Sequence, residues 1–169
     1  MKIVVLAGGL SPERNVSLSS GCKVCAALRE RGHEAALIDM YLGTQGDPQD
    51  LFSAPIPEKL TKIGRQAPDL AAVKASRPGG EASQFGPGVL EICRMADLVF
   101  LCVHCAFWED GRVQAAFDLM GIPYTGSGCL GSAIAMDKDL TKRLVAPLGV
   151  LTPKWELVRY AAEDIPALA

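Results

Sequence analysis

Residues 3–9 read Ile-Val-Val-Leu-Ala-Gly-Gly, and residues 34–40 read Glu-Ala-Ala-Leu-Ile-Asp-Met. The first run is apolar until its two glycines, which is typical of a parallel strand buried on both faces. Between the runs, apolar residues recur at helical spacing over about 16–31, and Gly32 supplies a helix stop. This strand–helix–strand unit predicts an α/β fold, a Rossmann-like open parallel sheet with helices on both faces.

The second half of the chain returns to the same alternation. The pattern predicts helices over about 89–95, 112–120 and 132–146, and strands over about 97–104 and 122–126. Residues 42–88 are rich in proline and glycine, so we expect mostly irregular, mobile chain there, with a weak strand or helix near 70–75. Residues 150–160 combine a turn with a β-rich run. We therefore predict an N-terminal domain over 1–147 and the opening of a second domain over 148–169.

Composition is that of an ordinary globular protein, because 49% of the residues are hydrophobic and 21% are charged. The formal net charge of −2 comes from interspersed acids and bases, so we expect no nucleic-acid partner. Apolar runs such as 98–103 fall far short of the roughly 20 residues that span a bilayer. The N-terminus lacks a signal-peptide pattern, which favours a cytoplasmic protein that does not bind membranes.

The six cysteines include two Cys-x-x-Cys pairs, Cys22/Cys25 and Cys102/Cys105. Zinc ribbons place such pairs about 15 to 20 residues apart, whereas these pairs are much further apart in the sequence. The first pair also lies inside a predicted helix. We therefore expect no metal site and interpret the cysteines as reduced thiols packed like small hydrophobic side chains.

Polar and glycine-rich segments follow the predicted strands, at the sheet edge where ligands bind in such folds. After the first strand, Gly8 and Gly9 allow close backbone approach, and Glu13 precedes a helix N-terminus. Glu13 is a candidate binding acid, although a carboxylate at this position more often only stabilises the start of a helix. His104 leaves a buried strand beside two acids and is either a functional group or a packed histidine.

A third segment reads Pro-Tyr-Thr-Gly-Ser-Gly over 123–128 and Met-Asp-Lys-Asp-Leu-Thr-Lys over 136–142. The Gly-Ser-Gly turn permits close approach of the backbone to a ligand, whereas a lysine pair at the spacing of Lys138 and Lys142 is most often a solvated helix face. Together, Gly8–Gly21, His104–Gln114 and Pro123–Lys142 resemble the D-alanine:D-alanine ligases, in the same order along the chain.

The resemblance implies an ATP-grasp enzyme whose first part is a Rossmann-like pre-ATP-grasp domain. In that family, ATP phosphorylates one D-alanine and the amine of a second D-alanine attacks the acyl phosphate, which yields a dipeptide for peptidoglycan. By the same resemblance, Glu13 orients the first D-alanine through its ammonium group, His104 lines that subsite, and Lys138 reaches the nucleotide phosphates. The family also implies a homodimer, and ATP and Mg²⁺ as cofactors of the full-length enzyme.

Two features depart from the family. The family usually reads His-Gly-x-x-Gly-Glu-Asp-Gly, and Cys105 and Trp108 replace both glycines. We expect these side chains to strain or block the loop at a cost of about 1 kcal/mol or more each, and glycine at both positions to raise the activity of a full-length enzyme. The residues up to Ala169 also lack the family's magnesium ligands and glycine-rich flap, so we expect this chain alone to bind no cofactor firmly and not to catalyse ligation.

Three other interpretations stay open. The second substrate could be D-serine or D-lactate instead of D-alanine. The chain could instead be a stand-alone nucleotide-binding module, with Asp39 at the end of the second strand as a ribose-binding acid. It could also be a non-catalytic dimerisation partner that uses exposed apolar surface.

Overall fold

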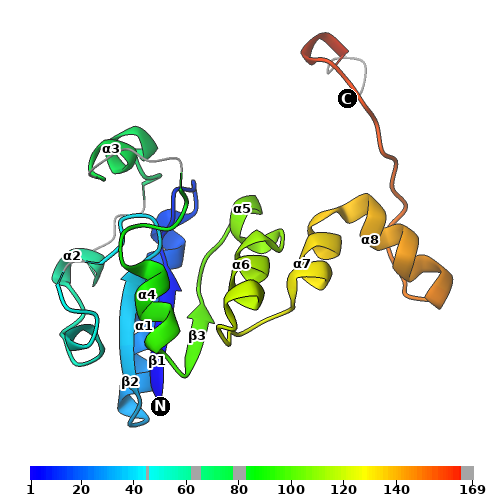
Figure 1. The fold of residues 1–169 in the computed structure, drawn as a ribbon. Helices are drawn as coiled ribbons and strands as arrows, with labels where there is room; N and C mark the ends of the chain where they lie inside the picture. Colours follow the sequence, from blue (N-terminus) through cyan, green and yellow to red (C-terminus); the bar gives the residue numbers. More distant parts are fainter. Residues whose placement is uncertain (45, 62–65, 78–82, 165–169) are drawn as a thin grey trace.

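Three parallel strands in the order β2–β1–β3 form the centre of the computed structural model (Figure 1). They are β1 (Lys2–Ala7), β2 (Glu34–Asp39) and β3 (Leu98–Leu101). The structure describes residues 1–44, 46–61, 66–77 and 83–164. β1 lies between its two neighbours, and its apolar side chains are buried on both faces of the sheet. The continuous apolar run at 3–7 is therefore the central strand, as its composition predicted.

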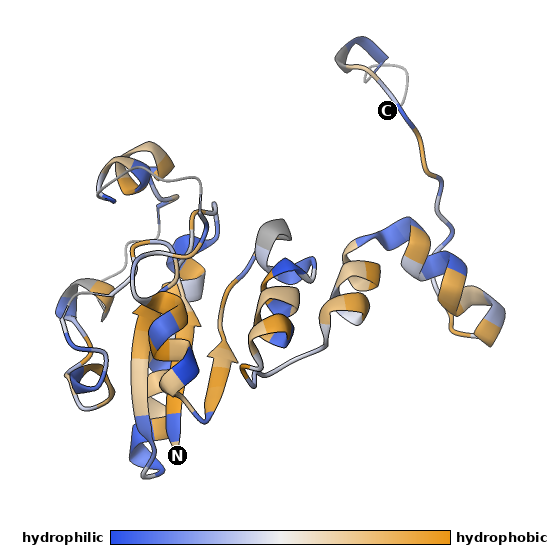
Figure 2. Ribbon diagram, viewed as in Figure 1, coloured by the Kyte–Doolittle hydropathy of each residue, from blue (hydrophilic) through white to orange (hydrophobic). Residues whose placement is uncertain are grey.

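Helices cover both faces of this sheet, which confirms the predicted α/β arrangement. The helices are α1 (Arg14–Glu30), α2 (Glu58–Thr61), α3 (Leu70–Ala75), α4 (Val89–Met95), α5 (Ala106–Glu109), α6 (Arg112–Met120), α7 (Cys129–Met136) and α8 (Lys138–Val145). On one face α1 packs Leu18 and Cys25 against Val5 and Leu37. On the other face α4 and α6 share a core with the opposite side of β1 and with β3. Figure 2 shows the strands as the most continuous hydrophobic part of the ribbon.

The third strand is shorter than predicted, because a side-chain hydroxyl hydrogen-bonds the carbonyl of the residue that follows it. β3 ends at Leu101, whereas the sequence pattern predicts a strand as far as His104. The amide of Cys102 still donates to Leu6 O (2.8 Å), but its carbonyl accepts from Ser17 Oγ (2.5 Å). The chain is then free to turn away from the sheet, and this turn carries His104.

Two other predictions need correction. Residues 122–126 form no strand but a single parallel bridge between Val99 and Tyr124, because the amide of Leu101 donates to the Thr125 hydroxyl (3.1 Å) and not to a main-chain carbonyl. The helix predicted over 132–146 is two helices, α7 and α8. Asp137 lies between them in an extended conformation, and its carboxylate accepts from Leu140 N (2.9 Å) as the N-cap of α8.

The proline- and glycine-rich region contains more regular structure than expected. It holds a 3₁₀ turn at Asp50–Phe52 and the short helices α2 and α3. The weak signal at 70–75 is α3, which begins where Asp69 accepts from Ala72 N (3.0 Å). Residues 45, 62–65 and 78–82 of this region lie outside the described part of the chain, so the expectation of irregular chain there is not addressed.

The C-terminal elements extend away from the sheet (Figure 1). α8 packs against α7 and the 3₁₀ turn Ala146–Leu148, and residues 150–160 have no regular secondary structure, although a β-rich run was expected. Trp155 holds this segment on α8, since its Nε1 donates to Asp139 (2.8 Å) and its ring lies 5.2 Å from Lys142 Nζ. Among the described residues, no helix combines the length and apolar character that crossing a bilayer requires.

Candidate functional site

The loop after β1 is built around two glycines that no other residue could replace without strain. Gly8 and Gly9 have φ values of 78° and 80°, in the left-handed region that favours glycine. A Cβ at Gly8 would lie 2.9 Å from Asp39 Cγ, so the backbone approaches that side chain as closely as glycine allows. The Gly8 amide donates to Ser17 Oγ (2.8 Å), and that hydroxyl donates to Cys102 O (2.5 Å). These bonds tie β1, α1 and the end of β3 together below the loop.

A buried ion pair supports the same loop from the side of β2. Arg14 and Asp39 are each only 6% exposed, and Arg14 donates to both carboxylate oxygens of Asp39. Arg14 also donates to Gly9 O (2.8 Å), while Asp39 Oδ1 accepts the amides of Tyr41 and Leu42 (3.0 Å each). Sequence patterns did not single out Arg14. The available signal was a positive charge at the start of a helix and a negative charge at the end of a neighbouring strand.

The structure brings Glu13 and His104 to the same edge of the sheet, on the loops that follow β1 and β3. Glu13 precedes α1 and is exposed, and its side chain makes no capping hydrogen bond to the helix. It instead accepts from Cys105 Sγ (3.3 Å), the neighbour of His104. His104 is half-buried, with Nδ1 4.0 Å from Glu109 Oε1. Glu13 is thus an accessible carboxylate at the start of α1, where a negative charge also suits the helix dipole, and it contacts the residue that follows His104 in the chain.

The two residues at the family's glycine positions behave differently. Cys105 has a φ of 89°, a left-handed conformation that is strained for a residue with a Cβ. Among the described residues, it is the one non-glycine residue with a positive φ. Its amide donates to Glu109 Oε2 (3.0 Å). Trp108 lies in α5, so its backbone has no positive φ. The residue is only 2% exposed, so its ring packs inside the protein and does not cover the loop on the solvent side. The expected strain thus occurs at Cys105 and not at Trp108.

Lys138 is not brought to this pair. It is the first residue of α8 and is exposed, in a helix that packs on α7 and not on the sheet. Lys142, one turn later, donates to Pro153 O (3.3 Å) and is therefore a local contact. A role of Lys138 at the nucleotide phosphates stays a prediction.

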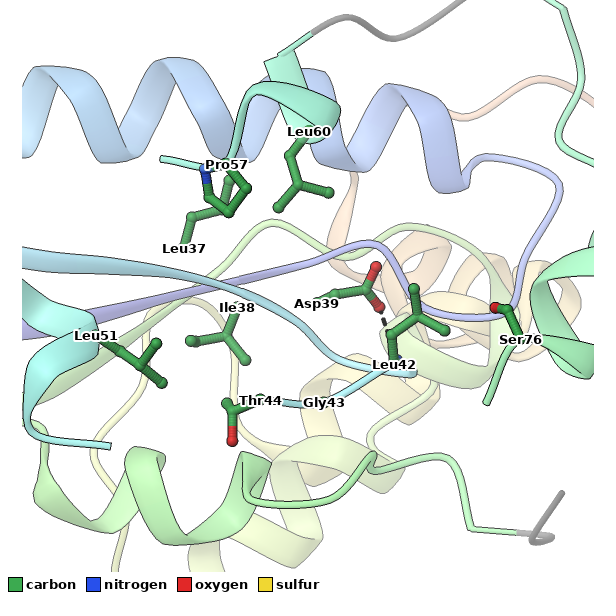
Figure 3. A pocket seen from close by; sticks show the side chains of 10 residues that line it. All are labelled: Leu37, Ile38, Asp39, Leu42, Gly43, Thr44, Leu51, Pro57, Leu60 and Ser76. Atoms are coloured by element: carbon green, nitrogen blue, oxygen red, sulfur yellow. Dashed lines mark hydrogen bonds between the residues drawn. The ribbon is translucent and has the colours of Figure 1, made fainter. Parts of the chain in front are cut away.

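Two cavities flank the strand ends. One of about 290 Å³ lies after β3 and is lined by Glu109, Gln114, Thr125 and Ser127 among others. The other, of about 370 Å³, lies beside β2 and is lined mainly by aliphatic side chains such as Leu37 and Leu60 (Figure 3). Asp39 reaches this second cavity, but its oxygens are already taken by Arg14 and backbone amides. The interpretation of Asp39 as a ribose-binding acid is therefore not supported.

The buried thiols are poor nucleophiles and poor metal ligands. Burial raises the pKa of Cys93 to about 12, with a further contribution from Glu91, and burial raises the pKa of Cys102 to about 11. Burial also raises the pKa of Cys25. In the described ranges, no set of three or more His, Cys, Asp or Glu side chains is arranged to hold a metal ion. The three buried thiols pack inside the cores on the two faces of the sheet.

Comparison with known proteins points in one direction. A family described as "D-ala D-ala ligase N-terminus" matches residues 2–127. D-alanine–D-alanine ligase of Lacticaseibacillus casei is 43% identical over 155 residues, which cover 90% of this chain and 43% of that protein. D-alanine–D-alanine ligase of Pediococcus pentosaceus is 39% identical over 173 residues, which cover 100% of this chain and 49% of that protein. The chain thus spans less than half the length of these relatives.

Solved structures give the same result for the fold. The D-alanine–D-alanine ligase of Coxiella burnetii superposes with a TM-score of 0.63 at 26% identity, over 99% of this chain and 48% of that one. The enzyme from Bacillus anthracis, in complex with ATP, superposes with a TM-score of 0.59 at 25% identity, over 99% and 44%. The matched residues include both loops that carry Glu13 and His104.

Proposed function

Because the chain belongs to the D-alanine:D-alanine ligase family, with its N-terminal domain matched over residues 2–127, we propose that it forms the D-alanine-binding part of such a ligase. The enzyme would join two D-alanine molecules at the expense of ATP, for peptidoglycan synthesis in the cytoplasm. The relatives described above are named for D-alanine, which favours it over D-serine or D-lactate as second substrate. Neither a stand-alone nucleotide module nor a purely structural partner is favoured.

The observation that carries this proposal is the pair of Glu13 and His104 at one sheet edge. Glu13 offers an exposed carboxylate that makes no side-chain hydrogen bond to the helix, which suits the ammonium group of an amino acid. His104 lies half-buried at the same edge, with its Nδ1 4.0 Å from Glu109 Oε1. A cation held on Glu13 would place the carboxylate of the same D-alanine at a fixed distance, and such positioning is a large part of catalysis when two substrates must react.

ATP, when bound, supplies the phosphoryl group that activates the D-alanine carboxylate. Lys138 is the residue of this chain that we propose to contact its phosphates, since a compact cation suits developing negative charge. It is exposed and therefore accessible to a nucleotide. Among the described residues, no three or more His, Cys, Asp or Glu side chains are grouped to hold a metal ion, so we assign no Mg²⁺ ligand to them.

We also propose a homodimer. Large apolar side chains are exposed on the part of the chain that leaves the sheet, with Leu148 80% and Leu151 99% exposed. Exposed apolar surface of this kind favours association. Sedimentation equilibrium over a range of concentrations tests it, and a concentration-independent monomer would refute it.

Amide NMR titration of the ¹⁵N-labelled chain tests the proposed function. We expect D-alanine to bind weakly, with shifts centred on Gly9 and His104, and L-alanine to produce smaller shifts at equal concentration. Glu13→Gln should abolish the D-alanine shifts because the ammonium loses its counter-charge. Glu30→Gln is the matched control, which neutralises an exposed carboxylate at the other end of α1 and should leave them unchanged. Equal responses to D- and L-alanine, or an unaffected Glu13→Gln variant, would contradict the proposal.

A further inference from the structure

The loop that carries Glu13 contacts the loop after β3 at both of its ends. At the far end, Cys105 Sγ lies 3.3 Å from Glu13 Oε2. At the near end, the buried ring of Trp108 faces Gly9 so closely that a Cβ on Gly9 would meet ring atoms at 3.1 Å. Both contacts are made by side chains at positions where the family has glycine, and glycine has no side-chain atoms that could make either of them.

The backbone at Cys105 aims its side chain at Glu13. A φ of 89° is costly for a residue with a Cβ, so the surrounding structure must hold it in place. Glu109 does so, because its Oε2 accepts the Cys105 amide (3.0 Å) while its Oε1 lies 4.0 Å from His104 Nδ1. One carboxylate thus fixes the residue that contacts Glu13 and lies beside the histidine of the same site.

We propose that Cys105 is a positioning residue for Glu13. The thiol donates its hydrogen to Oε2, which limits rotation of an otherwise exposed side chain and leaves Oε1 free to accept the ammonium group of D-alanine. Trp108 supports the arrangement from below by filling the space against Gly9. The proposal rests on the proposed function, since it assigns Cys105 a role in the same D-alanine site.

The geometry distinguishes this role from a blocked site. Cys105 is half-buried and Glu13 is exposed, so the contact leaves the carboxylate open to solvent on its other side. A thiol is a weak donor, and a carboxylate that receives one keeps most of its capacity for a charged partner. Replacing Cys105 with glycine therefore has two opposite effects: it relieves the backbone and it removes the donor.

Three substitutions separate these effects. Cys105→Ser keeps a donor at nearly the same place and should bind D-alanine within about twofold of the unmodified chain. Cys105→Ala keeps the Cβ but loses the donor, and should weaken binding roughly two- to tenfold, the range of a single modest hydrogen bond, because a thiol is a weak donor. Cys105→Gly should unfold at a higher temperature than Cys105→Ala because the left-handed conformation is no longer strained, yet bind D-alanine at least as weakly. Unchanged or tighter binding by Cys105→Ala would overturn the proposal.

The S–H stretching band supplies a readout that a purely structural role would not move. The infrared difference between the unmodified chain and Cys105→Ala isolates this thiol from the other five cysteines. We expect a band shifted to low frequency by the charged acceptor, and a return to higher frequency in Glu13→Gln, where the acceptor is neutral. The matched control is the band isolated with Cys129→Ala, which should not respond to Glu13→Gln.

The two readouts separate the possible failures. If the unmodified chain binds no D-alanine, the proposed function fails and the positioning role fails with it. If it binds D-alanine but the Cys105 band ignores Glu13→Gln, only the positioning role is refuted. Weaker binding by Cys105→Ala, rescue by Cys105→Ser and a band that depends on Glu13 would together establish it.

Discussion

Substitution of Arg14 with methionine should destabilise the fold more than any change on the surface. Arg14 and Asp39 are each 6% exposed, so the pair is held away from water. Methionine fills a similar volume but leaves the carboxylate buried without its counter-charge. Removing one partner of a buried pair costs about 3–5 kcal/mol, and Arg14→Met also loses the bond to Gly9 O. This is a large fraction of the roughly 5–15 kcal/mol that stabilises a typical domain.

Removing both charges should recover much of that loss. In Arg14→Met with Asp39→Asn, the amide oxygen of the new asparagine can still accept the backbone amides of Tyr41 and Leu42, which Asp39 Oδ1 now accepts at 3.0 Å. No unpaired charge is left inside. We therefore expect the double variant to be more stable than Arg14→Met alone, with a coupling free energy of about 2–3 kcal/mol between the two sites.

Urea unfolding followed by circular dichroism measures these differences, provided that the slope of the transition is unchanged. Arg143→Met is the control. Arg143 also pairs with an aspartate, Asp139 one turn earlier in the same helix, but the Arg143 side chain is 64% exposed. It should have little effect. A loss below about 1 kcal/mol for Arg14→Met, or a double variant as unstable as the sum of its parts, would show that the pair is not the support described above.

Two further predictions concern the packing of the sheet. Gly21→Ala should destabilise the fold by about 1–3 kcal/mol, since its Cβ would lie 2.7 Å from Ala7 Cβ and 2.9 Å from Leu37 Cδ1. Gly131→Ala, whose Cβ would have its nearest neighbour at 3.6 Å, should instead stabilise the fold by up to about 1 kcal/mol through helix propensity. Thermal unfolding of both variants checks the contrast. Burial raises the pKa of Cys93 from 9.0 to about 12, so the stability that its protonated thiol contributes is complete below pH 9 and is lost as pH rises towards 12. The melting temperature should therefore fall over this pH range, and should fall less steeply in Cys93→Ala. An equal dependence of melting temperature on pH in both proteins would contradict the assignment.

Local sequence patterns were sufficient to predict those strands and helices whose buried face follows directly from the spacing of their apolar residues. The apolar run of β1 and the helices α4 and α6 were predicted with the bounds that the structure has or within one residue of them. The failures occur where a side chain competes with the main chain. Ser17 takes the carbonyl of Cys102, Thr125 takes the amide of Leu101, and Asp137 starts a new helix inside an apolar stretch. Hydropathy averages over such single bonds and cannot place them.

The candidate site divides in the same way. The sheet topology follows from the alternation of elements, so the proximity of the loops after β1 and β3 could be anticipated. The pairing of Cys105 with Glu13 could not, because it depends on the left-handed backbone at Cys105 and on Glu109 across the turn. Arg14 was missed for a similar reason: it lies on a helix that looks amphipathic, and only the three-dimensional arrangement shows that it is buried against Asp39.

The two departures from the family pattern are better understood as one change than as two defects. A strained Cys105 alone would cost stability without return, and a tryptophan alone would need a place for a large ring. In the structure the ring of Trp108 is buried against Gly9, and Cys105 is held by Glu109 where it reaches Glu13. Both side chains support the same loop, one at each end. The strain at Cys105 therefore accompanies a contact that positions the residue on which the proposed function depends most.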